Sequence, residues 1–263
     1  MDLGIRDRVA VVAASSKGLG REAARSLAEE GVKVVLCARG EDELKKTAEA
    51  IGRDTGTEIL DVAADLTREA DVRRLVERTV ERFGTVHILV NNCGGPPAGT
   101  FLDHDLDRWR RAVETNLMSA VMLTREVVPF MIKNGWGRIV NITSISVKQP
   151  LPNLILSNSI RAAVIGWAKT LASELGKYDI LVNNLCQGYF LTDRLYSLAE
   201  GKANEEGRTV EDVLGAWSET VPVGRVGRPE EFGPLVAFLA SERASYITGD
   251  SIAIDGGFCQ SLL

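Results

Sequence analysis

The chain has 263 residues, of which 45% are hydrophobic and 25% are charged, and its formal net charge at pH 7 is −5. This length can form one large α/β domain with a sizeable core, and the composition is ordinary for a soluble globular protein. The acidic balance argues against nucleic acid or an anionic membrane as a partner, because such partners attract basic surfaces. The chain contains no apolar run of signal-peptide or membrane-span length, so we expect a cytoplasmic protein.

The cysteines and histidines do not form the spacing patterns of a metal site. The four cysteines are Cys37, Cys93, Cys186 and Cys259. They lie far apart in the sequence, which favours buried thiols in a reducing compartment over disulfides or zinc ligands. With only two histidines besides, we expect no metal centre.

Apolar runs of strand length alternate with amphipathic segments of helix length almost to the end of the chain. Strands are expected over residues 9–12, 32–37, 58–63, 86–90, 138–142, 180–185 and 251–254. This alternation is typical of a parallel sheet that helices cover on both faces. Because the sequence shows neither repeats nor a linker, we expect a single domain over residues 1–263.

Two longer stretches have their own interpretation. A long helix is expected over residues 107–133, where Pro129 could introduce a kink. Residues 192–217 are polar and lack strand character, and we interpret them as a candidate lid over the site.

The stretch VAVVAASSKGLGR at residues 9–21 predicts a strand, a tight turn and the start of a helix. Such a turn presents unpaired N–H groups and the positive end of the helix dipole, which suit a phosphate. Gly18 and Gly20 add backbone freedom, and Gly20 allows close packing of the helix on the strand. Taken alone, this turn favours nucleotide binding only modestly.

Short polar stretches follow the first six expected strands. They cover residues 15–20, 38–39, 65–66, 91–95, 144–148 and 187–192. Ligands of open parallel sheets bind beyond the carboxyl ends of the strands, where these stretches would meet. Together they predict a dinucleotide site.

These stretches resemble the motifs of the short-chain dehydrogenase/reductase family. The matching pieces are SSKGLG at 15–20, Asp65 with Leu66, NNCGG at 91–95, Asn116, GRIVNITS at 137–144, QGYFLT at 187–192, GRVGRPEE at 224–231 and YITGDSIAIDGG at 246–257. The resemblance implies a Rossmann-like, doubly wound, mostly parallel seven-stranded sheet with helices on both faces, and a nicotinamide cofactor. It also implies an assembly, commonly a tetramer built on the fourth and fifth long helices, with a homodimer as the alternative.

The same resemblance assigns a set of cofactor-binding residues. They are Ser15, Ser16, Lys17, Gly18, Leu19, Gly20, Arg39, Asp65, Leu66, Asn92, Gly94, Gly188, Phe190 and Thr192.

The end of the second strand bears on the choice between NADP and NAD. An acidic residue there would bind the ribose 2′-hydroxyl of NAD and repel a 2′-phosphate. This chain has Ala38 and then Arg39, with Lys17 in the glycine-rich turn, and two converging cations suit the 2′-phosphate of NADP. The alternative is that Arg39 is a solvated surface residue. We expect NADP, with NAD as the less favoured choice.

The first turn departs from the family pattern at one glycine. Ala14 stands at that position, and we expect a negative φ there, which would tolerate the methyl group. Gln187 replaces a proline that the family usually has, which changes only the rigidity of that turn.

The catalytic positions depart further. The family has a serine, a tyrosine thirteen residues later and a lysine four residues after that, and here these positions are Ser144, Ser157 and Arg161. A serine hydroxyl is too weak an acid to replace the tyrosine, and arginine keeps its proton at any useful pH. Ser144 can still bind a substrate carbonyl, and Arg161 can hold the cofactor ribose or an anionic group. Asn116 completes the candidate catalytic set.

Three residues could replace the missing acid. Lys148 follows the same strand end as Ser144, and burial beside Arg161 would lower its pKa toward that of a useful acid. A solvated loop lysine beside Pro150 is an equally supported alternative. Tyr189 carries a phenol, although packing against the cofactor explains it more simply. His104 lies in a loop at the correct edge, where a surface role is the simpler reading. His87 begins a strand at the other edge and is excluded.

The sequence therefore predicts an NADP-dependent oxidoreductase that moves hydride between nicotinamide and a carbonyl or alcohol, resembling the 3-oxoacyl-carrier reductases. One alternative is a catalytically silent dinucleotide-binding sensor, which SNSIR at 157–161 favours. Another is a lyase, isomerase or dehalogenase that uses Lys148 or Arg161. The halohydrin dehalogenases pair Ser and Tyr with Arg, but they remodel the dinucleotide turn that is intact here. Lys148 and Arg161 hint at an anionic substrate.

Overall fold

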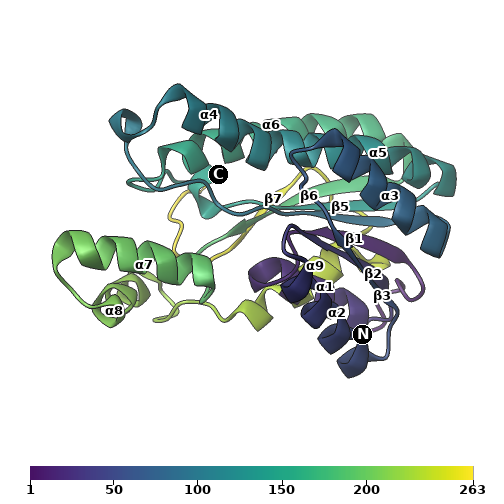
Figure 1. Ribbon diagram of the computed structural model, residues 1–263, viewed down its shortest axis with the longest axis horizontal. Helices are drawn as coiled ribbons and strands as arrows, with labels where there is room; N and C mark the ends of the chain where they lie inside the picture. The colour runs from purple at the N-terminus through teal and green to yellow at the C-terminus, as the bar shows by residue number, and fades with distance from the viewer. Residues whose placement is uncertain (263) are drawn as a thin grey trace.

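The computed structural model describes residues 1–262 and contains one seven-stranded sheet with helical layers on both faces (Figure 1). The strands are β1 (Val9–Ala13), β2 (Lys33–Ala38), β3 (Ile59–Ala63), β4 (Ile88–Asn91), β5 (Gly137–Ile142), β6 (Ile180–Gln187) and β7 (Ser251–Ile254). The α-helices are α1 (Gly18–Glu29), α2 (Glu41–Thr55), α3 (Glu69–Phe83), α4 (Leu106–Val113), α5 (Ser119–Asn134), α6 (Ile155–Leu175), α7 (Asp193–Glu206), α8 (Val210–Thr220) and α9 (Gly233–Leu239).

The sheet has the order β3-β2-β1-β4-β5-β6-β7, and every pair of neighbouring strands is parallel. The chain begins in the middle of the sheet, so the direction in which strands are added reverses between β1 and β4. This reversal opens a crevice at the carboxyl ends of these two strands. The predicted α/β, Rossmann-like class is confirmed.

Side chains of successive strand residues alternate between two cores. Ala10 and Val12 of β1 face the layer formed by α1, α2 and α9, whereas Val11 and Ala13 face α3, α5 and α6. Because all five residues of β1 are buried, the strand is apolar throughout instead of alternating with polar residues. The two layers lie below and above the sheet in Figure 1.

The predicted helix over residues 107–133 is interrupted, and the interruption lies at Asn116 and not at Pro129. A π-helical turn, Glu114–Met118, joins α4 to α5, and α5 continues through Pro129. The Asn116 amide donates hydrogen bonds to the carbonyl of Ala112 (3.1 Å) and to the hydroxyl of Thr115 (2.8 Å). These side-chain bonds accompany the extra residue in this turn, and π turns of this kind are frequent at functional sites.

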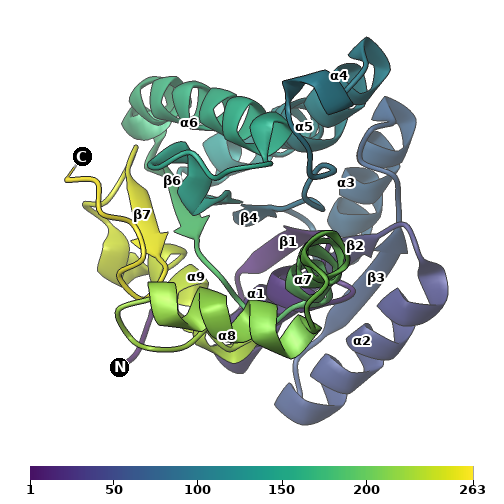
Figure 2. The same ribbon diagram turned by 90° about the vertical axis from the view of Figure 1, so that its left-hand side faces the viewer.

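Residues 192–217 form helices and not the irregular stretch that their polarity suggested. Thr192 and Thr209 cap the starts of α7 and α8 by accepting hydrogen bonds from backbone N–H groups. Ala199, Ala203 and Val213 form a small core between the two helices. In Figures 1 and 2 this helical pair stands at one end of the sheet, apart from both layers.

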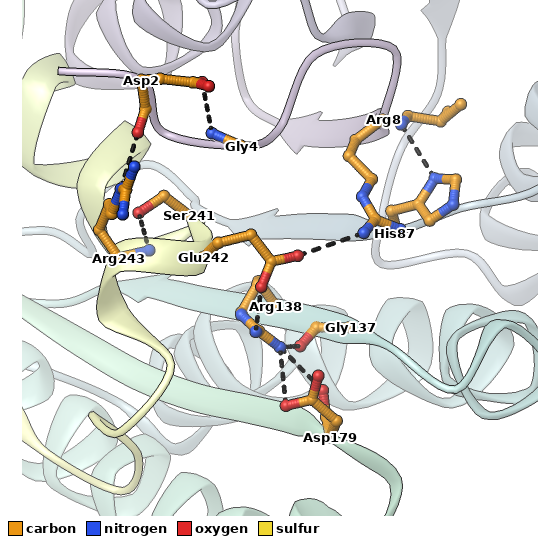
Figure 3. A network of polar contacts seen from close by, with 11 residues as sticks. Asp2, Gly4, Arg8, His87, Gly137, Arg138, Asp179, Ser241, Glu242 and Arg243 are labelled. Carbon is orange, nitrogen blue, oxygen red and sulfur yellow. Dashed lines mark hydrogen bonds and ion pairs between the residues drawn. The ribbon is translucent and has the colours of Figure 1, made fainter.

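The amino ends of the strands are closed by a cluster of charged side chains around Arg138 (Figure 3). Arg138 is 1% exposed, donates to the carbonyl of Asp179 (2.8 Å) and lies 3.9 Å from the carboxylate of Glu242. The guanidinium carbons of Arg8 and Arg138 lie 4.1 and 4.2 Å from the ring centroid of Trp136. This cluster joins β5 to the segments around it, far from the carboxyl ends where ligands bind.

His87 belongs to the same end of the sheet, as its exclusion from the site requires. Its Nδ1 accepts a 3.1 Å hydrogen bond from the N–H of Val9, which ties the start of β4 to the start of β1 (Figure 3). Burial, and to a smaller extent the charge of Arg8, lowers the pKa of His87 to about 4. None of the helices among residues 1–262 has both the length and the apolar character of a membrane span.

Candidate active site

The turn between β1 and α1 is built to receive an anion. Helix α1 begins at Gly18, whose φ is +58°, and the preceding Lys17 makes no side-chain cap. The first turn of α1 contains no acidic residue. Its N–H groups and positive dipole end are therefore available to a phosphate.

Ala14 adopts a left-handed conformation, with φ at +47°, so the expectation of a negative φ was wrong. The Ala14 carbonyl accepts a 3.2 Å hydrogen bond from the Asn92 side chain at the end of β4. A Cβ atom at Gly20 would collide with this carbonyl and come within 2.7 Å of the Asn92 amide. The turn is held in place by contacts that leave no room at Gly20, which confirms the close packing expected there.

The side chains of this turn have structural tasks besides any contact with a ligand. The Ser15 hydroxyl donates to the carbonyl of Val12 (2.8 Å) and accepts from the N–H of Cys37 (3.0 Å), joining β1 to β2. The carbonyl of Ser16 accepts from the hydroxyl of Thr47 on α2 (2.8 Å), and Leu19 packs against the core. A ligand would therefore meet the backbone of this turn and not the Ser15 hydroxyl.

Lys17 and Arg39 differ in whether their positive charge already has an acidic partner. The Lys17 ammonium forms a 2.7 Å ion pair with Asp193 at the start of α7, and both side chains are largely exposed. Arg39 is exposed and makes no ion pair or hydrogen bond within residues 1–262. Only Arg39 is thus free to bind a 2′-phosphate without giving up a partner.

The residues after β3 form a rigid turn. The Asp65 carboxylate accepts hydrogen bonds from the N–H (3.0 Å) and hydroxyl (2.8 Å) of Thr67, and the Asp65 N–H donates to Asp71 (2.9 Å). Asp65 thereby positions Leu66, whose side chain lines the cavity described below.

The segment after β6 packs against the core and borders the glycine-rich turn. Gly188 packs against Asp255, where a Cβ atom would come within 2.6 Å of that side chain. Thr192 caps α7 and lies beside Gly18, so this segment borders the glycine-rich turn. Phe190 is 5% exposed and packs edge-on against Phe232, so its side chain belongs to the core.

A cavity lies at the carboxyl ends of β4 and β5. Its lining residues are Ala13, Leu66, Asn91, Asn92, Cys93, Asn116, Ser119, Ala120, Asn141, Ile142, Thr143, Arg161 and Val164. It brings together four of the predicted site residues, namely Leu66, Asn92, Asn116 and Arg161. Gly94, which follows Cys93, is exposed and lies outside the lining.

Arg161 is the charged residue of this cavity. The side chain is 7% exposed, and its Nη1 donates a 3.0 Å hydrogen bond to the carbonyl of Ile142 at the end of β5. Arg161 also lies beside the Cys93 thiol, which donates to the Asn116 side-chain oxygen at 3.1 Å. Burial raises the pKa of this thiol, and the charge of Arg161 opposes the rise. Cys93, interpreted from sequence as a core residue, is thus a link between two site residues.

Ser144 and Ser157 occupy the positions expected for them. Ser144 is 8% exposed and accepts a 3.1 Å hydrogen bond from the N–H of Ser146, which leaves its own proton available to a ligand. Ser157 is 7% exposed and lies on the first turn of α6, one helical turn before Arg161.

The candidates for a replacement acid do not join this cavity. Lys148 lies near the Cys186 thiol and outside the cavity lining, and within residues 1–262 it makes no hydrogen bond with Arg161. Tyr189 stacks on Trp217 with ring centroids 5.2 Å apart and contacts Phe258 at 5.1 Å, and burial raises its pKa. Tyr189 therefore packs against α8 and the carboxyl-terminal segment.

His104 is buried, contrary to the surface role expected for it. It is 7% exposed, and neither ring nitrogen has a hydrogen-bond partner within residues 1–262. Its ring packs against Gly99, whose N–H donates to the carbonyl of Asn153 before α6 (2.7 Å). His104 thus fixes the loop after β4 against the entrance to α6.

Arg194 is a site residue that the sequence did not reveal. It lies in the first turn of α7, and its Nη2 donates a 2.6 Å hydrogen bond to the carbonyl of Pro96. Burial, followed by the nearby charge of Arg161, lowers the pKa of Arg194. No motif surrounds it, so only the approach of α7 to the loop after β4 could identify it.

Comparisons with known proteins agree with this geometry. The profile of the family described as Enoyl-(Acyl carrier protein) reductase matches residues 13–259. A 3-oxoacyl-[acyl-carrier-protein] reductase of Aquifex aeolicus is 32% identical over 98% of this chain and 99% of its own length. The chain is a member of the short-chain dehydrogenase/reductase family.

Solved structures of this family share the fold over nearly the whole chain. The L-sorbose reductase of Gluconobacter frateurii, crystallised with NADPH and L-sorbose, has a TM-score of 0.95 and 35% identity, with full coverage of both chains. A variant of the actinorhodin polyketide ketoreductase, crystallised with NADPH, has a TM-score of 0.92 and 33% identity, over 96% of this chain and 97% of that one. The predicted family and enzyme class are confirmed, and the NADPH of both neighbours agrees with the predicted cofactor. This short-chain dehydrogenase/reductase carries Ser157 and Arg161 on α6 where tyrosine and lysine were expected.

Proposed function

We propose that this protein transfers hydride between NADPH and a carbonyl or alcohol group of a small substrate, as a 3-oxoacyl reductase does. The observation that carries the proposal is the cavity at the ends of β4 and β5. It connects Leu66 and Asn92, on the side expected for the dinucleotide, with Arg161 on the side expected for the substrate.

The residues of this chain fit NADPH. The uncapped start of α1 has the donors for a pyrophosphate, and the unpaired, exposed Arg39 has the charge for a 2′-phosphate. We assign residues 15–20, Arg39 and Asn92 to the cofactor, with Asp65 positioning Leu66 beside it. When bound, the cofactor supplies the hydride.

Ser144 and Arg161 stabilise the negative charge that develops on the substrate oxygen during the reaction. As the carbonyl carbon gains hydride, its oxygen becomes negative, and the Ser144 hydroxyl donates a hydrogen bond to it. Arg161, fixed to the carbonyl of Ile142 two residues before Ser144, adds a positive charge in the same region. A proton taken up from solvent then neutralises this oxygen and completes the alcohol. Asn116 and Cys93 position Arg161 from the opposite wall.

Loss of NADPH absorbance over a panel of oxo esters, oxo acids and ketoses tests this function. Ser144→Ala should lower kcat/KM about 100-fold, because one donor to the developing oxyanion is lost, while NADPH affinity is unchanged. Ser159→Ala is the matched control, because Ser159 is exposed on α6, the helix that carries Arg161. Equal activity of the Ser144→Ala and wild-type proteins would contradict the assigned role.

A second candidate is a dinucleotide-binding protein without turnover. It is favoured by the position of Lys148, Tyr189 and His104, none of which lines the cavity as a replacement acid. Micromolar NADPH binding, with no turnover across the panel in either direction, would decide for this candidate and against the reductase.

We further propose that residues 1–263 work as one domain in the cytoplasm, with α7 and α8 as the lid. Family likeness supports a homotetramer formed through the α4–α5 and α6 region, or a homodimer, and gives no support for nucleic-acid or membrane partners. Light scattering coupled to size exclusion measures the assembly.

A further inference from the structure

Two arginines from separate elements lie beside the same short segment of chain, Cys93–Pro96. Arg161 reaches it from α6 and lies next to the Cys93 thiol. Arg194 reaches it from α7, and its Nη2 donates a hydrogen bond to the carbonyl of Pro96. The Nε of Arg194 lies 3.0 Å from the point where a Cβ atom would stand if Gly95 had a side chain. Cys93, at the start of this segment, lines the cavity at the ends of β4 and β5.

Neither guanidinium has an acidic partner. Within residues 1–262 their hydrogen bonds go to backbone carbonyls, those of Ile142 and Pro96, and no carboxylate lies within ion-pair distance of either. Asp193, which directly precedes Arg194 in the sequence, forms an ion pair with Lys17. Arg138, which is buried like Arg161, is by contrast within 4 Å of two carboxylates.

This arrangement is unfavourable without a counter-charge. Arg161 is buried and Arg194 is partly buried, and the proximity of the two positive charges adds repulsion; partial burial, followed by the charge of Arg161, lowers the pKa of Arg194. Proteins compensate buried cations with anions, and planar guanidiniums bind carboxylate or phosphoryl oxygens through paired hydrogen bonds. An anion bound between α6 and α7 would balance these positive charges.

We propose that Arg161 and Arg194 together bind an oxyanion of the substrate, a carboxylate or a phosphoryl group. This inference rests on the proposed reductase function, and it makes the substrate an oxo acid or a phosphorylated carbonyl compound. Arg194 is then the specificity-determining residue, since Arg161 also serves the reacting oxygen. Because Arg194 belongs to the lid, the anion also holds α7 against the loop after β4.

The first test measures anion binding without turnover. Oxamate and inorganic phosphate are titrated by calorimetry into the protein saturated with NADP⁺, which occupies the phosphate sites of the cofactor. Wild type should bind at least one of them, and Arg194→Met should weaken that binding at least tenfold. The anion that binds distinguishes a carboxylate site from a phosphoryl site. Arg208→Met, an exposed arginine beyond the end of α7, is the control and should bind as wild type does.

The second test measures specificity with acetoacetate and its methyl ester. Wild type should have at least a tenfold higher kcat/KM for the acid, and Arg194→Met should remove this preference by raising KM for the acid alone. Arg194→Lys should restore part of it. If neither compound is reduced, the proposed reductase function is contradicted. The calorimetric titration still tests whether Arg161 and Arg194 bind an anion, because it does not depend on turnover.

Two results would overturn the proposal. One is a failure of the anion test: either the wild type binds neither oxamate nor phosphate, or Arg194→Met binds them as tightly as the wild type does. The other is a weaker NADPH affinity in Arg194→Met with unchanged anion binding, which would assign Arg194 to the cofactor.

Discussion

The side-chain amide of Asn92 donates a 3.2 Å hydrogen bond to the carbonyl of Ala14. This bond joins the end of β4 to the first turn of the cofactor site. It also requires Ala14 to turn its carbonyl toward β4, which accompanies the φ of +47°. The strands on either side of the crevice are thus linked through one backbone group.

Replacing Ala14 with glycine should stabilise the protein. A left-handed conformation costs an alanine about 1–2 kcal/mol, and glycine adopts it freely but loses about 0.5–1 kcal/mol of chain entropy on folding. The free energy of unfolding in guanidinium should therefore rise by up to about 1 kcal/mol. Ala13→Gly is the matched control and should destabilise, because Ala13 is a buried strand residue. A less stable Ala14→Gly protein would mean that the methyl group makes favourable contacts.

Arg39→Asp should reverse the cofactor preference. The substitution removes the cation proposed for the 2′-phosphate and supplies a carboxylate that can accept from a ribose hydroxyl. In fluorescence titrations, NADPH affinity should fall at least tenfold and NADH affinity should hold or rise. Arg53→Asp makes the same change of charge at an exposed residue of α2 and should alter neither affinity. If NADPH still binds as in wild type, the 2′-phosphate lies elsewhere.

His87 should make stability depend on pH between about 6.5 and 4. Its pKa in the folded protein is about 4 against an ordinary 6.5, so the unfolded chain takes up a proton in this range before the folded one does. Stability should fall as the pH drops from 6.5 to 4, by about 1–2 kcal/mol once solvent screening of the half-buried ring is allowed for.

Denaturant unfolding at pH 7 and pH 4.5 measures this loss, and His87→Gln should reduce it. Below pH 4 both proteins should lose stability together as carboxylates with lowered pKa values, such as Glu231 at about 2, begin to bind protons. An unchanged loss in His87→Gln would assign the dependence to another group.

The sequence by itself determined the order of the strands and helices and the position of the site at the strand ends. Apolar runs and turn residues act locally, because a strand or a helix start depends mostly on neighbouring residues. The resemblance to the short-chain dehydrogenase/reductase family then assigned Ser144, Ser157 and Arg161 to its catalytic positions. The polar helices α7 and α8 were missed because their apolar stripe is narrow and buries only a few residues against each other.

Only the tertiary structure decided how individual side chains are used. Phe190 faces the core, Tyr189 stacks on Trp217, and Arg194 approaches Arg161 across about thirty residues of chain. The φ of Ala14 likewise follows from contacts with a residue 78 positions away. The direction of a side chain depends on the packing of elements distant in sequence, and no local pattern records that packing.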